Sequence, residues 1–259
     1  MKNWPSSYAT GVAGTINKLV FANGLFFAAT GKGVYWSEDG TKWTQGVSDA
    51  GVNVCYANGL FVAGTSGSGL YYSEDGKTWT QSNITSGKYE AVCYGNGVWV
   101  SCGSSGAGYC SEDGKTWTQN NLESNTRAIA FEGGLFVACK SSGLYYSEDG
   151  ITWTQSNVTS DDFAGGAAYN GNVWVAAGNT PYYSEDGKTW TQSGVGTIYC
   201  RELELGGGMF VIGSGKGVYY SADGKTWSQS NLTSGEHKGV AYGDGVWVAA
   251  SATGIYYSE

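Results

Sequence analysis

The stretch Tyr71-Tyr72-Ser73-Glu74-Asp75-Gly76-Lys77-Thr78-Trp79-Thr80-Gln81 recurs in variant copies along the whole chain. The serines that mark its copies follow one another at intervals of 36 to 38 residues: Ser37, Ser73, Ser111, Ser147, Ser184, Ser221 and Ser258. Seven units of about 37 residues therefore fill the 259 positions. A repeat with a period in this range is typical of a solenoid, a propeller or an array, and it outweighs any local secondary-structure prediction.

Residues 88–119 show what one unit contains. Residues 91–94 and 98–102 have the β-branched and aromatic character of strands, and the turn Gly95-Asn96-Gly97 separates them. Asn-Gly between two such runs predicts a hairpin with a type I′ turn. Residues 109–111 and 116–119 flank a second turn at 112–114. Each unit is therefore predicted to be a four-stranded antiparallel meander.

Seven such units predict an all-β, seven-bladed β-propeller that forms a single domain over residues 1–259, because stacked blades bury both faces of each sheet. An open solenoid would need polar caps, which neither terminus supplies. Residues 255–259 read as a third strand without its fourth, and Lys2-Asn3-Trp4 reads as a fourth strand without its first three. We expect the two to pair and complete the seventh blade, with Pro5 tolerated on the edge strand.

The composition limits the partners of this chain. The net charge is −8, and Arg127 and Arg201 are the only arginines, so neither nucleic acid nor an anionic membrane is expected as a partner. No apolar run has the length of a signal peptide or a membrane span, so the expected location is cytoplasmic, with other locations left open. A monomer is expected as well. Each of the six cysteines is interpreted as a small buried apolar residue. Cys93, Cys102 and Cys110 share one repeat, which leaves a disulfide there open.

The segment Ser73-Glu74-Asp75-Gly76-Lys77-Thr78-Trp79 and its copies resemble the Asp-box (BNR) repeat of sialidase-like propellers, S-x-D-x-G-x-T-W. Asp and Gly are adjacent here, so the turn is one residue shorter than in that family. The resemblance implies a structural role, in which the aspartate accepts backbone hydrogen bonds and the tryptophan closes over the hairpin. The residues concerned are Asp39, Asp75, Asp113, Asp149, Asp186 and Asp223, with Trp4, Trp43, Trp79, Trp117, Trp153, Trp190 and Trp227.

The resemblance does not extend to sialidase chemistry, because two arginines cannot form the arginine triad of that family. His237 is the only histidine and is expected to lie on the surface, and no G-x-S-x-G nucleophile motif opens a helix. One carboxylate pair per turn is too few for a calcium cage. We therefore expect no enzyme, no cofactor and no metal, although paired carboxylates on the loops remain possible in principle.

The repeats also show where recognition is expected. The turns between the first and second strands and between the third and fourth strands are uniform. The connections that enter the first strand of each blade, and those between the second and third strands, share the opposite face, and that face varies. Residues that frame these entrances are candidates for ligand contact, because loops on a rigid scaffold commonly carry recognition. The alternative is that exposed loop positions simply drift. The candidate ligand-binding residues are Asn17, Lys18, Asn53, Tyr89, Glu90, Arg127, Asp162, Arg201, Glu202, His237 and Lys238.

These observations favour a non-catalytic binding module, and a glycan is the first ligand class because exposed Tyr and polar loops suit sugars. The resemblance to repeat propellers, which include lectins, points the same way. The alternatives are a protein-interaction or structural propeller, for example in a phage or bacterial surface assembly, or a recently amplified or engineered repeat scaffold without a ligand. The N-x-T segments at Asn83, Asn157 and Asn231 are interpreted as loop chemistry and not as glycosylation sites.

Overall fold

The computed structural model describes residues 10–163, 165–251 and 254–258. The chain divides into two compact units, Met1–Gln119 and Asn120–Glu259. The described residues form seven antiparallel sheets and no helix, and their number and strand order confirm the predicted seven-bladed β-propeller. The single domain expected over residues 1–259 stays a prediction. The fourth strand expected at residues 2–4, with Trp4 and Pro5, lies outside the described residues.

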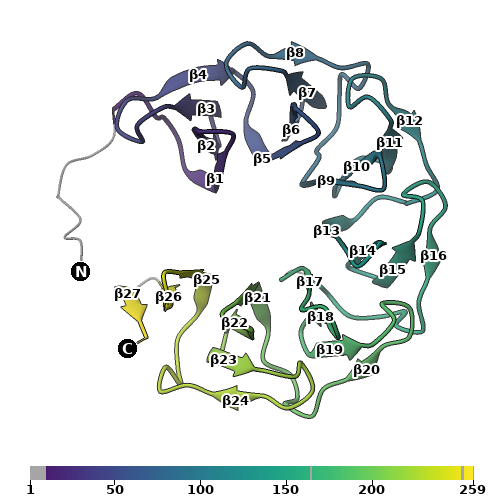
Figure 1. Ribbon diagram of the computed structural model, residues 1–259, viewed down its shortest axis with the longest axis vertical. Coiled ribbons are helices and arrows are strands. Elements are labelled where there is room, and N and C mark those ends of the chain that lie inside the picture. The colour runs from purple at the N-terminus through teal and green to yellow at the C-terminus, as the bar shows by residue number, and fades with distance from the viewer. Residues whose placement is uncertain (1–9, 164, 252–253, 259) are drawn as a thin grey trace. The chain divides into compact units, whose positions relative to one another are not determined.

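The first unit contains three four-stranded sheets, each a meander in chain order. Within this unit the first strands β1, β5 and β9 lie along one side and the fourth strands β4, β8 and β12 along the other (Figure 1). The strands are β1 Ile16–Ala22, β2 Leu25–Thr30, β3 Gly33–Ser37, β4 Thr44–Val47, β5 Gly51–Ala57, β6 Leu60–Thr65, β7 Leu70–Ser73, β8 Thr80–Gln81, β9 Ala91–Gly95, β10 Val98–Cys102, β11 Tyr109–Ser111 and β12 Thr118–Gln119.

The second unit contains three further four-stranded sheets and one sheet with three strands in its described part. The strands are β13 Thr126–Glu132, β14 Leu135–Lys140, β15 Gly143–Ser147, β16 Thr154–Gln155, β17 Ala167–Tyr169, β18 Trp174–Ala177, β19 Pro181–Ser184, β20 Thr191–Gln192, β21 Cys200–Gly206, β22 Met209–Ser214, β23 Gly217–Ser221, β24 Ser228–Gln229, β25 His237–Gly243, β26 Val246–Ser251 and β27 Gly254–Tyr257.

The hairpins between first and second strands follow the predicted turn chemistry in six of the seven sheets. At Asn58-Gly59, for example, φ is 49° and 76°, which is the pair of positive values that a type I′ turn requires. The sheet of β17 and β18 differs. There only Gly171 has a positive φ, and the Asn170 side chain accepts hydrogen bonds from the backbone N–H groups of Asn172 and Val173.

The Ser-x-Asp-Gly turn between third and fourth strands has one geometry in all six described copies. In the copy at residues 73–76, the Asp75 carboxylate accepts hydrogen bonds from the backbone N–H groups of Lys77 and Thr78 at 2.8 and 2.7 Å. Gly76 has a φ of 73°, and the Trp79 indole N–H donates to its carbonyl at 3.1 Å. The aspartate side chain thus takes the two backbone donors that lie between the turn and the start of the fourth strand.

Because of these turns, the stability of the protein is expected to fall at acid pH. The pKa of each described turn aspartate is lowered, and at Asp75 it falls to about 2, chiefly because the N–H groups of Thr78 and Lys77 stabilise the carboxylate. An unfolded aspartate has a pKa near 3.9. Because the pKa of these aspartates is lower in the folded than in the unfolded protein, their ionised carboxylates stabilise the fold. This contribution is fully present above about pH 4 and is lost as the pH falls toward about 2.

We therefore expect the urea midpoint to be constant from about pH 7 to 5 and to fall steeply between about pH 4 and 2. Asp75→Asn should lower the midpoint at pH 7 and flatten the fall, since an amide does not titrate. A midpoint that is unchanged down to about pH 2.5 would contradict this expectation.

Neighbouring sheets within a unit pack through the tryptophan that follows each turn. Trp79 lies between Phe27 of β2 and Phe61 of β6, with ring centroids 6.2 and 6.4 Å apart. Trp190 joins Leu135 and Val137 of β14 to Trp174 of β18 in one buried cluster. The repeated tryptophan therefore closes one sheet onto the next.

A second inter-sheet contact comes from asparagines in the connections that leave the fourth strands. The Asn83 side chain accepts from the Trp117 N–H and donates to the Trp117 carbonyl, both at 2.8 Å. Asn157 bonds Trp190 in the same way. The asparagines of the N-x-T segments at Asn83 and Asn157 thus have a structural role within these connections.

The cysteines mostly follow the expected pattern. Cys102, Cys110, Cys139 and Cys200 are buried, as predicted for small apolar residues, whereas Cys55 and Cys93 are half-buried. Burial raises the pKa of the Cys139 thiol to about 12, so this group remains neutral at physiological pH.

Candidate functional site

The two variable kinds of loop lie together within each unit. The loop between second and third strands pairs with the connection that leaves the fourth strand, through bridges between Ser68 and Gly87 and between Ser142 and Asp161. We call the surface formed by these loops and connections the connection face. It is the surface on which the variation among the repeats predicts a ligand.

The candidates of the first unit are largely occupied by contacts within the protein. The Asn17 amide donates to the carbonyl of Gly51 at 2.9 Å, which ties β1 to β5. Glu90 forms an ion pair with Lys88 at 2.5 Å. Asn53 is half-buried in β5, and Lys18 is exposed on β1. Of these four candidates, Asn17 and Lys18 are the exposed ones.

Tyr89 does not fit the expected role of a ligand-stacking ring. Its side chain is only 2% exposed and packs against Tyr109, with ring centroids 6.0 Å apart. Burial, together with Tyr109, raises the pKa of Tyr89 to about 12. Gly106 lies against the Tyr89 ring, so the loop over residues 103–108 covers it. A ring in this position cannot stack on a sugar.

The candidates of the second unit form exposed ion pairs that link neighbouring sheets. Arg127 Nε lies 3.2 Å from the Asp162 carboxylate, and Arg201 Nε lies 2.8 Å from the Glu236 carboxylate. Lys238 also pairs with Glu236, at 3.3 Å. The hydrogen bond from Lys238 is the main reason that the pKa of Glu236 is lowered. The Arg127, Asp162, Arg201 and Glu236 side chains are 41–49% exposed and Lys238 is 72% exposed. Glu202 is half-buried.

The expectation of a surface histidine is wrong. His237 is 2% exposed at the start of β25, its Nδ1 lies 3.2 Å from the carbonyl of Gly235, and its ring packs 5.7 Å from that of Tyr256. This burial has no signal in the sequence, because the position is occupied by a different residue in every repeat.

Tyr199 is an exposed aromatic residue on this face that was not among the predicted candidates. It is 47% exposed and has a φ of 58°, which is unusual for a residue with a bulky side chain. Its N–H donates to the carbonyl of Asn179 at 2.9 Å, and its carbonyl accepts from the N–H of Gly215 at 3.0 Å. Two loops therefore hold the backbone in this conformation.

The surroundings of Tyr199 are polar. Lys216 Nζ lies 5.6 Å from the centroid of the Tyr199 ring and donates to the carbonyl of Thr197 at 2.7 Å. Arg201, which forms the ion pair with Glu236, lies two residues after Tyr199 in the sequence. The sequence gives only a weak signal for this site: residues 193–199 lack the Ser-Asn-x-Thr-Ser pattern found at residues 82–86, 156–160 and 230–234, but residues 46–50 and 120–124 lack it as well.

Two kinds of site are absent from the part of the chain that the structure describes. Within it, no three His, Cys, Asp or Glu side chains come together as metal ligands. The same residues also include no helix that is long and apolar enough to cross a membrane.

No protein-family model matches this chain, and no curated protein matches its sequence. Solved structures do match it. The computationally designed Ika8 protein has a TM-score of 0.74 at 13% identity, over 96% of this chain and 85% of that one. YCF48 from Cyanidioschyzon merolae has a TM-score of 0.64 at 15% identity, over 94% of each chain. An ancestral GH74 enzyme has a TM-score of 0.69 at 14% identity, over 97% of this chain and 45% of that one.

The fold is that of a seven-bladed β-propeller. At these identities the likeness shows the fold alone, and this chain spans under half the length of several of the structures that it matches. The neighbours include an enzyme and a designed protein. A propeller suits a binding or structural module, and the chemistry has to be argued from the site.

Proposed function

We propose that this protein is a non-catalytic binding module that recognises a glycan on its connection face, with Tyr199 as the stacking residue. The observation that carries the proposal is an exposed aromatic ring fixed by backbone hydrogen bonds in a left-handed conformation. Such a conformation is costly and persists only where neighbouring structure maintains it, and it is often found at ligand sites.

The polar groups near the start of β21 suit a sugar. Hydroxyl groups can accept from Lys216 and Arg201 and donate to Glu236, whereas the Tyr199 ring offers an apolar face to sugar C–H groups. A non-catalytic role is supported by the chemistry of the rest of the face. Both arginines are held in ion pairs, and the only histidine is buried. The Ser-x-Asp-Gly turns, which we interpret as Asp boxes, maintain the scaffold.

The test is a glycan-array screen of the wild-type protein and three variants. Tyr199→Ala should reduce binding to any glycan that the wild type retains by about tenfold or more, which corresponds to ~1.4 kcal/mol. Tyr199→Phe should bind nearly as well, since it keeps the stacking ring. Ile151→Ala removes an exposed apolar side chain from a Ser-x-Asp-Gly turn and serves as the matched control.

A specific observation also favours a protein partner. The exposed pairs Arg127–Asp162 and Arg201–Glu236 present alternating charges, which suit a complementary polar surface. A blank array from protein with an intact circular dichroism spectrum would reject the glycan proposal and favour this second candidate.

A further inference from the structure

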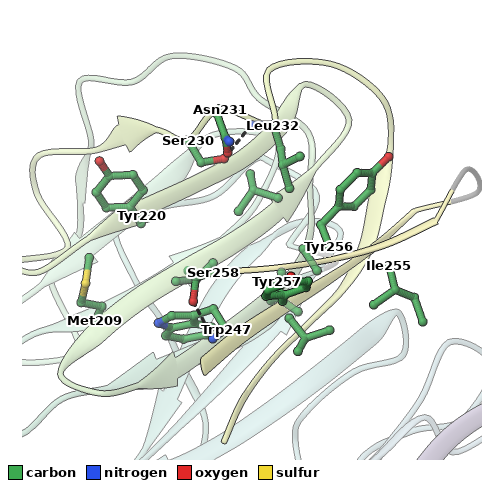
Figure 2. A pocket seen from close by; sticks show the side chains of 15 residues that line it. Met209, Tyr220, Ser230, Asn231, Leu232, Trp247, Ile255, Tyr256, Tyr257 and Ser258 are labelled. Carbon is green, nitrogen blue, oxygen red and sulfur yellow. Dashed lines mark hydrogen bonds between the residues drawn. The ribbon is translucent and has the colours of Figure 1, made fainter. Parts of the chain in front are cut away.

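Exposed aromatic side chains of the second unit lie in two different kinds of surroundings. One is an apolar groove of about 460 Å³, in which Met209 and Tyr220 lie on one wall and Trp247 and Tyr257 on the other (Figure 2). None of the described side chains that line this groove carries a charge. The other is the surface around Tyr199, which has charged groups beside the ring. Of the two, this surface is the one that offers partners to a charged ligand.

The lysine beside Tyr199 differs from the other cations of the second unit. The unit has seven lysines and arginines against fourteen aspartates and glutamates. Lys216 has no carboxylate within ion-pair distance among the residues that the structure describes, whereas the other six cations are all paired there: Arg127, Lys140, Lys188, Arg201, Lys225 and Lys238. In a unit rich in carboxylates, the lysine without an ionic partner therefore lies over the exposed ring of Tyr199.

Two carboxylates near this surface are bound to other groups. Glu236 is shared by Arg201 and Lys238, at 2.8 and 3.3 Å. The Asp161 carboxylate accepts hydrogen bonds from three backbone N–H groups, at 2.7, 3.2 and 3.4 Å. Neither carboxylate forms an ion pair with Lys216, so the positive charge of Lys216 is available to a ligand.

The position of Lys216 is fixed before any ligand binds. Its backbone N–H donates to the hydroxyl of the buried Ser214 at 3.1 Å, and its carbonyl accepts from the Gln229 amide at 2.7 Å. Its ammonium donates to the carbonyl of Thr197 at 2.7 Å and lies 5.6 Å from the centroid of the Tyr199 ring. Since an ammonium has three N–H donors, two remain for a ligand.

The first unit contains the same loop without the ring. Lys32 lies between β2 and β3 as Lys216 lies between β22 and β23, and its N–H likewise donates to a hydroxyl, that of Thr30. Thr15 takes the place of Tyr199, because its carbonyl accepts from the N–H of the glycine before the lysine in the same way. A lysine thus belongs to this type of loop, and Lys32 is a matched control for Lys216.

We infer that the glycan bound at Tyr199 is acidic, and that Lys216 binds its charged group, which is either the carboxylate of a uronic acid or a sulfate ester. This inference rests on the glycan-binding function proposed above. A sugar that stacks on the exposed part of Tyr199 places its substituents beside the Lys216 ammonium. A hydrogen bond from an ammonium to an anionic oxygen is shorter and stronger than one to a hydroxyl, so an acidic sugar gains more from this contact than a neutral one.

Binding of the full-length protein to matched pairs of glycans tests the inference. The probes are arrayed uronate-bearing glycans and sulfated glycans, together with their methyl-esterified and desulfated counterparts, in which the same sugar chain has no charge. The wild type should bind a charged form about tenfold or more tightly than its neutral counterpart. Added salt should reduce this difference, because it screens an exposed charge. The preferred set, uronate or sulfate, identifies the charged group.

Five variants assign the preference to Lys216. Lys216→Met keeps the apolar stem beside the ring and should weaken binding of the charged form about tenfold, while binding of the neutral form changes less than about twofold. Lys216→Arg keeps the charge and should retain the preference. Lys32→Met should bind like the wild type. Tyr199→Ala should weaken binding of both forms, whereas Tyr220→Ala, in the apolar groove, should weaken neither.

Two results would overturn the inference and leave the proposed function standing. The first is equal affinity for charged and neutral forms that is lost in Tyr199→Ala. The second is a preference for the charged form that persists in Lys216→Met, because another cation would then bind the charged group. A failure of every glycan to bind would overturn the proposed function, and the inference with it.

Discussion

Replacing Trp190 by alanine is expected to lower the free energy of unfolding by about 3–5 kcal/mol. Trp190 is 3% exposed and belongs to the cluster that joins Leu135 and Val137 of β14 to Trp174 of β18. Truncation removes the contact that holds two sheets together and leaves a cavity, which adds to the lost transfer free energy. The hydrogen bond from the indole N–H to the carbonyl of Gly187, 3.2 Å long, is lost as well.

Urea unfolding followed by far-ultraviolet circular dichroism measures this effect, with the slope of the transition compared between proteins. Trp190→Phe is the matched control. It keeps an aromatic ring but loses part of the volume and the indole N–H, so a loss of about 1–2 kcal/mol is expected. A loss below about 1 kcal/mol in Trp190→Ala would contradict the proposed role of this residue in closing one sheet onto the next.

The sequence was sufficient for the parts of the fold that local chemistry determines. The repeat period, the Asn-Gly hairpins and the four-stranded meander all follow from residues close together in the chain, and six hairpins have the expected positive φ values. The exception at Gly171 follows from the order Gly-Asn in place of Asn-Gly, because the Asn170 side chain then closes the turn. At this turn the prediction from local sequence fails because a side chain takes over a backbone role.

The candidate site was less predictable because exposure depends on distant segments. Comparison of the repeats selected Tyr89 as variable and aromatic, yet it could not show that the loop around Gly106 covers the ring. The bonds from Asn83 to Trp117 cross 34 residues, so the segment looked like an ordinary loop. Tyr199 was missed for a similar reason, since its unusual φ is maintained by Asn179 and Gly215 of two other loops.

Replacing Gly69 by alanine is the second change with a large expected effect. Gly69 precedes β7 with a φ of 82°, and a Cβ atom there would lie 2.0 Å from the carbonyl oxygen of Ile84. That oxygen accepts the hydrogen bond from the N–H of Leu70 at 3.0 Å, so it cannot move away without breaking the bond. A left-handed residue costs about 1–2 kcal/mol and a broken buried hydrogen bond about 1–3 kcal/mol. Together they predict a loss of about 2–5 kcal/mol.

Gly97 provides a control with the same backbone conformation. Its φ is also 82°, but a Cβ atom at this hairpin would meet nothing within 4 Å. Gly97→Ala should therefore cost only the conformational part, about 1–2 kcal/mol. The difference between the two variants in urea unfolding measures how closely the connection after β8 approaches the start of β7. Equal losses would mean that the connection yields easily, and the connection face would then be a less rigid scaffold for a ligand than the structure indicates.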